Sequence, residues 1–174
     1  MKSILTILLL IVVLFSACSP AKVEIQAPEK YTVIELDSSN QHLFENTTPT
    51  NLKFYEIQML DSIIKYAIAD HNQKAKDDYQ KLMTYSPGME DNEEGYLLDY
   101  QDYYRQFIPY INERGEKVVN VSCFCDITNM NGDLEGLNWR TDLIQVNDGG
   151  NCYFHLVVNL TLKTFAHLMV NGVG

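Results

Sequence analysis

Hydrophobic and polar positions divide the chain into a helical part and a later part rich in strands. Between residues 52 and 81, apolar side chains recur at the i, i+3, i+4 spacing of one face of an amphipathic helix. Residues 72–81 are so highly charged that a separate, exposed helix is an alternative there. A β-branched and aromatic run at residues 31–36 predicts a strand, and the polar stretch 37–50 predicts a loop.

After residue 98 the pattern changes to strands separated by turn residues. The strands are expected at residues 103–111, 117–125, 139–146, 152–160 and 164–170. The sequence Asp-Gly-Gly-Asn at 148–151 is typical of a tight hairpin turn. One main helix followed by an antiparallel meander indicates an α+β fold. We expect the helix to pack on a sheet of four to six strands.

The order of strand, helix and hairpin-linked strands resembles the cystatin-like and NTF2-like folds. The C-terminal part contains Cys-Phe-Cys at 123–125, Trp139, Asp-Gly-Gly-Asn-Cys at 148–152 and Val-Asn-Gly at 170–172. Through these features, residues 50–174 resemble a group of small Gram-negative lipoproteins. This resemblance implies the α+β fold and carries no activity with it.

The first 18 residues have the order of an export signal. Lys2 is followed by an apolar run at residues 4–15, too short for a membrane span, and then by Ser16, Ala17 and Cys18. This segment resembles a bacterial lipoprotein signal, with Phe15 where the family usually has Leu. The resemblance implies cleavage before Cys18, lipidation of that cysteine, and outer-membrane sorting because Ser19 follows it. A secreted protein cut near Ala17, with Cys18 free, is the alternative.

The leader predicts three segments: a signal peptide at 1–17, a lipidated tether at 18–30 and a single domain at 31–174. Removing residues 1–17 leaves 12 basic and 23 acidic residues, a net charge of −11. So acidic a chain is not expected to bind nucleic acid or anionic lipid through its surface. The lipid anchor is the expected attachment to the membrane, and the leaflet that the domain faces is left open.

Three cysteines fall within the predicted domain. Cys123 and Cys125 share one face of a predicted strand, and Cys152 begins the apolar face of another. In an oxidising compartment, a disulfide between Cys152 and either Cys123 or Cys125 is expected, with three reduced core cysteines as the alternative. The spacing does not favour a zinc site, and no metal or cofactor is expected.

Tyr153, His155 and His167 lie on adjacent predicted strands and are candidates for a pocket on the open face of the sheet, near Tyr103 and Tyr104. Two ordinary sheet histidines are the alternative interpretation.

No catalytic motif stands out in the sequence, and the paired carboxylates lie in polar runs typical of a solvated surface. We therefore expect a non-enzymatic lipoprotein of the cell envelope that acts as a binding or interaction module, with an envelope protein or a small ligand as its partner. A small-ligand receptor or enzyme with a pocket on the open sheet face is the alternative. A second alternative is a cystatin-like protease inhibitor, because Gln145 and Gly149 have the spacing of the inhibitory hairpin of cystatins.

Overall fold

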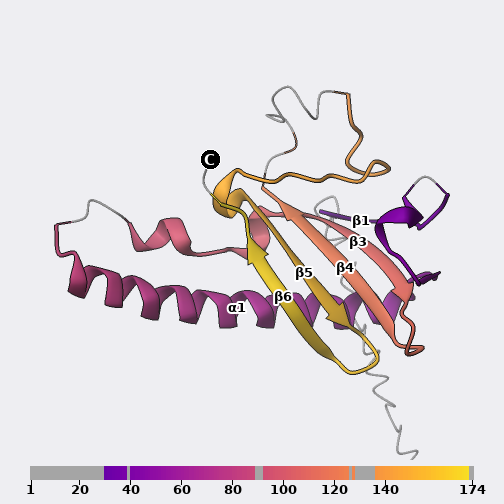
Figure 1. Cartoon of the computed structure of the whole chain (residues 1–174), viewed down its shortest axis with the longest axis horizontal. Coiled ribbons are helices and arrows are strands. Elements are labelled where there is room, and N and C mark those ends of the chain that lie inside the picture. Colours follow the sequence, from indigo (N-terminus) through magenta and orange to yellow (C-terminus); the bar gives the residue numbers. More distant parts are fainter. Residues whose placement is uncertain (1–29, 39, 89–91, 126, 128–135, 173–174) are drawn as a thin grey trace, which may run out of the picture.

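The computed structural model describes residues 30–38, 40–88, 92–125, 127 and 136–172. One long helix packs on a six-stranded sheet (Figure 1), so the predicted α+β fold is confirmed. The strands follow the order β1 (Tyr31–Val33), β3 (Tyr104–Ile111), β4 (Lys117–Phe124), β5 (Tyr153–Asn159) and β6 (Thr164–Val170), and β2 (Thr48–Pro49) also pairs with β3.

The strands β3 to β6 form the expected antiparallel meander. β1 differs from this plan, because it pairs parallel with β3 and places Tyr31 opposite Arg105. The crossover that a parallel pair needs is supplied by the intervening helix. As a result, the start of the described chain lies beside the beginning of β3, about 70 residues further along the sequence.

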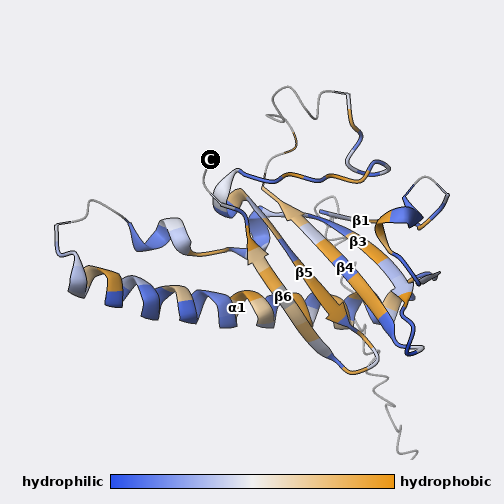
Figure 2. Ribbon diagram, in the orientation of Figure 1, coloured by the Kyte–Doolittle hydropathy of each residue, from blue (hydrophilic) through white to orange (hydrophobic). Residues whose placement is uncertain are grey.

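The helix α1 (Phe54–Tyr85) is continuous, so the alternative of a separate helix at 72–81 was wrong. Its N-terminus is stabilised by the Glu56 side chain, which accepts a hydrogen bond of 2.7 Å from the Lys53 backbone N–H. Its buried residues are Leu60, Ile64, Ala67 and Ile68, which fall on one face. This face packs against the alternating apolar residues of the sheet, Phe107, Val119, Val121, Phe154, Leu156 and Val158. Figure 2 shows the apolar stretches of β4 and β5 and the mostly hydrophilic outer surface of α1.

The second half of α1 extends past the sheet (Figure 1) and is covered by the returning chain. Two hydrogen bonds join the Asn72 side chain to the backbone of Leu98, at 2.8 and 2.9 Å. The 3-10 helix η2 (Glu93–Tyr96) also lies beside α1. There the ring centroids of Tyr79 and Tyr96 are 5.9 Å apart. These contacts attach the charged half of the helix to the rest of the domain.

The strand expected at residues 139–146 is absent, and that prediction was wrong. The segment instead lies against the sheet face that α1 leaves open, held there by the side chain of Gln106. The Gln106 amide donates to the carbonyls of Trp139 and Asp142, at 2.6 and 2.7 Å, and its oxygen accepts from the Ile144 N–H at 2.9 Å. One buried amide therefore satisfies the backbone groups that a partner strand would have paired.

None of the helices in the described ranges combines the length and the apolarity of a membrane span. The predicted signal peptide, Cys18 and all of the tether except Lys30 lie outside the described residues.

Candidate ligand-binding site

The predicted pocket residues meet only in part. Tyr153 and His155 lie on β5 and point away from α1, since they alternate with the buried Phe154 and Leu156. They border a cleft of about 350 Å³ that residues 144–147 also line. His167 lies in β6, and its side chain is outside the described set.

The tyrosines of the predicted cluster separate to different parts of the domain. Tyr103 is buried on the helix side, where its hydroxyl donates to the Asn151 carbonyl at 2.6 Å and its ring packs edge-on against Phe154. Burial raises the pKa of Tyr103 to about 12, so its hydroxyl stays protonated at neutral pH. Tyr104 lines a different and larger cavity.

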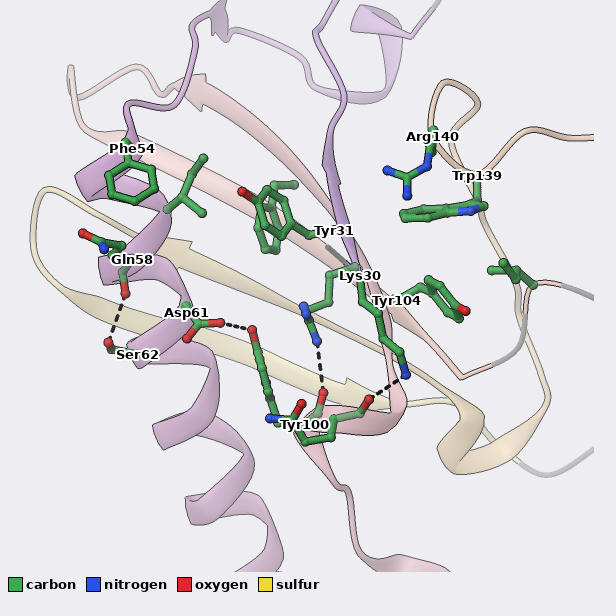
Figure 3. A pocket seen from close by; sticks show the side chains of 15 residues that line it. Lys30, Tyr31, Phe54, Gln58, Asp61, Ser62, Tyr100, Tyr104, Trp139 and Arg140 are labelled. Carbon is green, nitrogen blue, oxygen red and sulfur yellow. Dashed lines mark hydrogen bonds between the residues drawn. The ribbon is translucent and has the colours of Figure 1, made fainter. Parts of the chain in front are cut away.

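This larger cavity, of about 780 Å³, lies between the first turns of α1, the edge formed by β1 and β3, and the turn that carries Trp139. Figure 3 shows Phe54, Gln58 and Asp61 of α1 on one side and Trp139 and Arg140 on the other. Its volume is within the range of small-molecule sites, about 300–1,000 Å³.

Aromatic rings supply most of the cavity wall. Tyr31 stacks on Phe107 with ring centroids 5.4 Å apart, and Tyr104 and Trp139 meet edge to face at 5.1 Å. The Trp139 turn is fixed on both sides, because the Thr32 hydroxyl donates to the Arg140 carbonyl at 3.0 Å and Gln106 holds the Trp139 carbonyl. The aromatic wall is therefore preorganised by contacts with the sheet.

Arg105 brings a buried cation to this cavity. It is only 7% exposed, and its Nη1 donates to the carbonyls of Tyr100 and Tyr103, at 3.0 and 2.9 Å. Its Nε is enclosed without an acceptor. No carboxylate in the described part of the chain forms an ion pair with it. A buried guanidinium with unused donors is costly unless an anion compensates it.

Asp61 is the acidic residue among the described residues that line the cavity, and it is already paired. Its carboxylate accepts a hydrogen bond from the Tyr100 hydroxyl and another, of 2.6 Å, from Lys65. The Tyr100 ring then lies between Asp61 and Arg105, with its centroid 4.1 Å from the guanidinium. Asp61 therefore holds Tyr100 in place and leaves the Arg105 charge without an ion-pair partner.

Two further cations border the cavity, Lys30 and Arg140. The Lys30 ammonium donates to the Gln101 carbonyl at 2.8 Å and lies 5.2 Å from the Tyr104 centroid. The Arg140 guanidinium lies over the Trp139 ring at 4.3 Å (Figure 3). Cations resting on ring faces keep their hydrogen-bond donors available to a ligand.

Of the two disulfides that the sequence allowed, the structure contains Cys125–Cys152. Cys125 lies just after β4 and is exposed, so it does not share the buried face of Cys123 as expected. Cys123 is a buried free thiol whose pKa is raised by burial. The disulfide closes a loop that contains Trp139 and Arg140, and it therefore restrains one wall of the cavity. Within the described ranges, no cluster of three or more His, Cys, Asp or Glu residues is placed to hold a metal ion.

The expected inhibitory turn at Gln145 to Gly149 lies outside the strands, in the irregular segment that precedes β5. It therefore does not form the tip of a hairpin between paired strands, as the resemblance to cystatins implied.

The large cavity was missed in the sequence because its residues come from five separate segments. One signal was available: Tyr103, Arg105 and Phe107 alternate along one strand, which places an arginine on the same face as two aromatic residues. An arginine in the apolar phase of a strand indicates a buried charge that needs a partner.

Comparison with known proteins gives no match: no protein-family model, no curated protein and no solved structure is significantly similar to this chain.

Proposed function

We propose that this protein is a lipid-anchored binding module of the cell envelope, and that it binds a small molecule in the cavity between α1, β1 and Trp139. The observation that carries the proposal is the cavity of about 780 Å³, with aromatic walls and the buried Arg105 among its lining residues. The proposed site differs from the pocket that the sequence suggested at His155, because that cleft is smaller and more polar.

The architecture of the cavity supports binding in preference to a purely structural role. The cavity opens to the surface, because Phe54 and Arg140 at its wall are exposed, so a ligand can enter it. Here the wall is held open by the Trp139 turn, which Gln106 and Thr32 fix to the sheet. A fixed aromatic wall combined with polar groups that can orient a ligand is the usual composition of a small-molecule site.

The lipid anchor at Cys18 and the outer-membrane location are part of the same proposal and rest on the leader sequence. The described domain begins at Lys30, which itself borders the cavity. A ligand site next to the tether would then lie close to the membrane surface, because the tether is only about a dozen residues long.

The binding claim can be tested through Trp139, because it is the single tryptophan of the sequence and lies in the cavity wall. Its fluorescence is titrated with small aromatic compounds, beginning with phenylacetate, phenylacetamide and phenol. We expect saturable quenching by at least one of them. The variant Gln58→Tyr, which adds bulk at the cavity wall, should abolish the quenching.

The matched control is Gln80→Tyr, the same substitution at an exposed position on the second half of α1, away from the cavity. It should titrate like the wild-type protein. A flat titration with every compound, or equal quenching in the Gln58→Tyr variant, would contradict the proposed function.

The anchor is tested separately by metabolic labelling with an alkyne fatty acid in a Gram-negative host. We expect label and membrane association for the wild-type protein and neither for Cys18→Ser. An unlabelled wild-type protein in the soluble fraction would contradict the lipid anchor and leave the ligand site untouched.

A further inference from the structure

We infer that the ligand is an organic oxyanion, a carboxylate or a phosphate ester, with an apolar and preferably aromatic body. This inference rests on the proposed binding function. The acid group would bind at the Arg105 guanidinium, and the body would lie against the aromatic wall at Tyr31 and Trp139.

The charge at the cavity argues for an anion. The chain has 13 basic and 23 acidic residues, yet Lys30, Arg105 and Arg140 all border this one cavity. Asp61 is paired with Lys65 and accepts from the Tyr100 hydroxyl, so its charge acts on Arg105 only from a distance, without a direct ion pair. An excess of positive charge on an otherwise acidic domain attracts anions to this place in particular.

Arg105 gives the anion a specific anchor. Its Nη1 is held by two backbone carbonyls, which fix the plane of the guanidinium. Its Nε has no acceptor and is enclosed by protein atoms. A guanidinium fixed in this way at the cavity wall presents a positioned positive charge to a carboxylate or phosphate.

The Tyr100 ring under the guanidinium cannot replace such an anion. A ring face stabilises a desolvated cation by less than the cost of leaving a charge buried without an ion pair. The site as it stands is therefore undercompensated, and an oxyanion is the group that completes it.

The class of ligand is tested with phenylacetate and phenylacetamide, which share one body and differ in charge. Binding is followed by Trp139 fluorescence, with phenyl phosphate as a third probe. We expect the better of the two acids to bind at least about 10-fold more tightly than the amide, a difference of about 1.4 kcal/mol. Phenyl phosphate binding more tightly than phenylacetate would identify the oxyanion as a phosphate.

Variants assign the charge to named residues. Arg105→Gln should reduce acid binding to the level of the amide, and its fold is checked by circular dichroism because Arg105 is buried. Arg140→Gln changes an exposed side chain and keeps the test decisive if Arg105→Gln does not fold. It should weaken the acid about 3- to 10-fold and the amide by less, so that the preference for the acid falls.

The outcomes separate this inference from the proposed function. Equal affinity for acid and amide, or acid binding that is indifferent to both arginine substitutions, would overturn the oxyanion and keep the cavity as a binding site. Absence of binding by all three probes would overturn both claims.

Discussion

The guanidinium of Arg105 lies 4.1 Å from the centroid of the Tyr100 ring, and the same guanidinium donates to the Tyr100 carbonyl. Tyr100 in turn donates its hydroxyl to Asp61 of α1. The relationship joins a buried strand residue to the helix through one aromatic side chain. Burial lowers the pKa of Arg105 from its ordinary value, and the negative charge of Asp61 opposes part of that shift.

Replacement of Tyr100 separates the contribution of the ring from that of the hydroxyl. We expect Tyr100→Leu to lower the free energy of unfolding by about 2 kcal/mol, since it removes the ring face below a buried cation. Tyr100→Phe keeps the ring and should cost only about 1 kcal/mol, because Asp61 retains its bond from Lys65. Urea denaturation of both variants checks this, and an equal loss would show that the ring contributes nothing.

Loss of the disulfide should weaken both the fold and the cavity. Cys125 and Cys152 are separated by 27 positions, and for a loop of that size the chain-entropy stabilisation is about 3.5 kcal/mol. The loop contains Trp139, so reduction should also weaken ligand binding. Thermal unfolding and Trp139 titration with and without reductant measure the two effects.

The free thiol provides the control for that experiment. Cys123→Ala should respond to reductant like the wild-type protein, because Cys123 takes no part in the disulfide. In the double variant Cys125→Ser with Cys152→Ser, the reductant should have no further effect. Any response there would mean that another thiol pair is involved.

The ion pair between Glu56 and Lys117 makes the stability depend on acid. Lys117 Nζ lies 2.8 Å from the Glu56 carboxylate, and the side chains are only 12% and 18% exposed for Glu56 and Lys117, respectively. Burial alone would raise the pKa of Glu56, but the hydrogen bonds from Lys117 and from the Lys53 backbone outweigh it and lower the pKa from its ordinary 4.5. Because the folded pKa is depressed, the stabilisation is present above pH 4.5 and is lost as the pH falls through the folded pKa.

Glu56→Gln should therefore destabilise the protein by about 2 kcal/mol at neutral pH, with a difference that shrinks steadily below pH 4.5. Urea denaturation at several pH values gives the curve. The same substitution at the exposed Glu45 is the control and should leave the curve unchanged. A Glu56→Gln deficit that stays constant down to strongly acid pH would contradict this role of the carboxylate.

Gly149 is required for two independent reasons. Its φ is +91°, a conformation that side chains with a Cβ rarely adopt, and a Cβ there would lie 2.5 Å from the Tyr153 ring. We expect Gly149→Ala to cost about 2–3 kcal/mol. Gly115 also has a positive φ, of +74°, but a Cβ there would meet open space. Gly115→Ala should therefore lower the free energy of unfolding by only about 1 kcal/mol. Equal losses in thermal unfolding would exclude the contact with Tyr153.

The hydrophobic pattern predicts the main elements because their signals are local. The apolar spacing of Leu60, Ile64 and Ile68 marks α1, and the alternation of Phe154, Leu156 and Val158 marks β5. The pattern fails at residues 139–146, where strand-like residues form no strand. There the long-range hydrogen bonds of the Gln106 side chain replace a strand partner, and no local sequence pattern predicts them.

The candidate site could not be predicted for a similar reason. It depends on the parallel pairing of β1 with β3, which places Lys30 and Tyr31 beside Arg105, and on the turn that brings Arg140 to the same place. These relationships are set by tertiary packing between segments separated by about 35 to 75 residues. The resemblance to cystatin-like folds directed attention to the open sheet face instead, where the polar cleft at His155 lies.

The most direct test of the account is a crystal structure of the protein soaked with phenylacetate. The account predicts density in the cavity, with the carboxylate within hydrogen-bond distance of the Arg105 guanidinium and the phenyl ring against Tyr31 and Trp139. Phenylacetate bound only in the cleft at Tyr153 and His155, or in the cavity with its carboxylate turned away from Arg105, would contradict it.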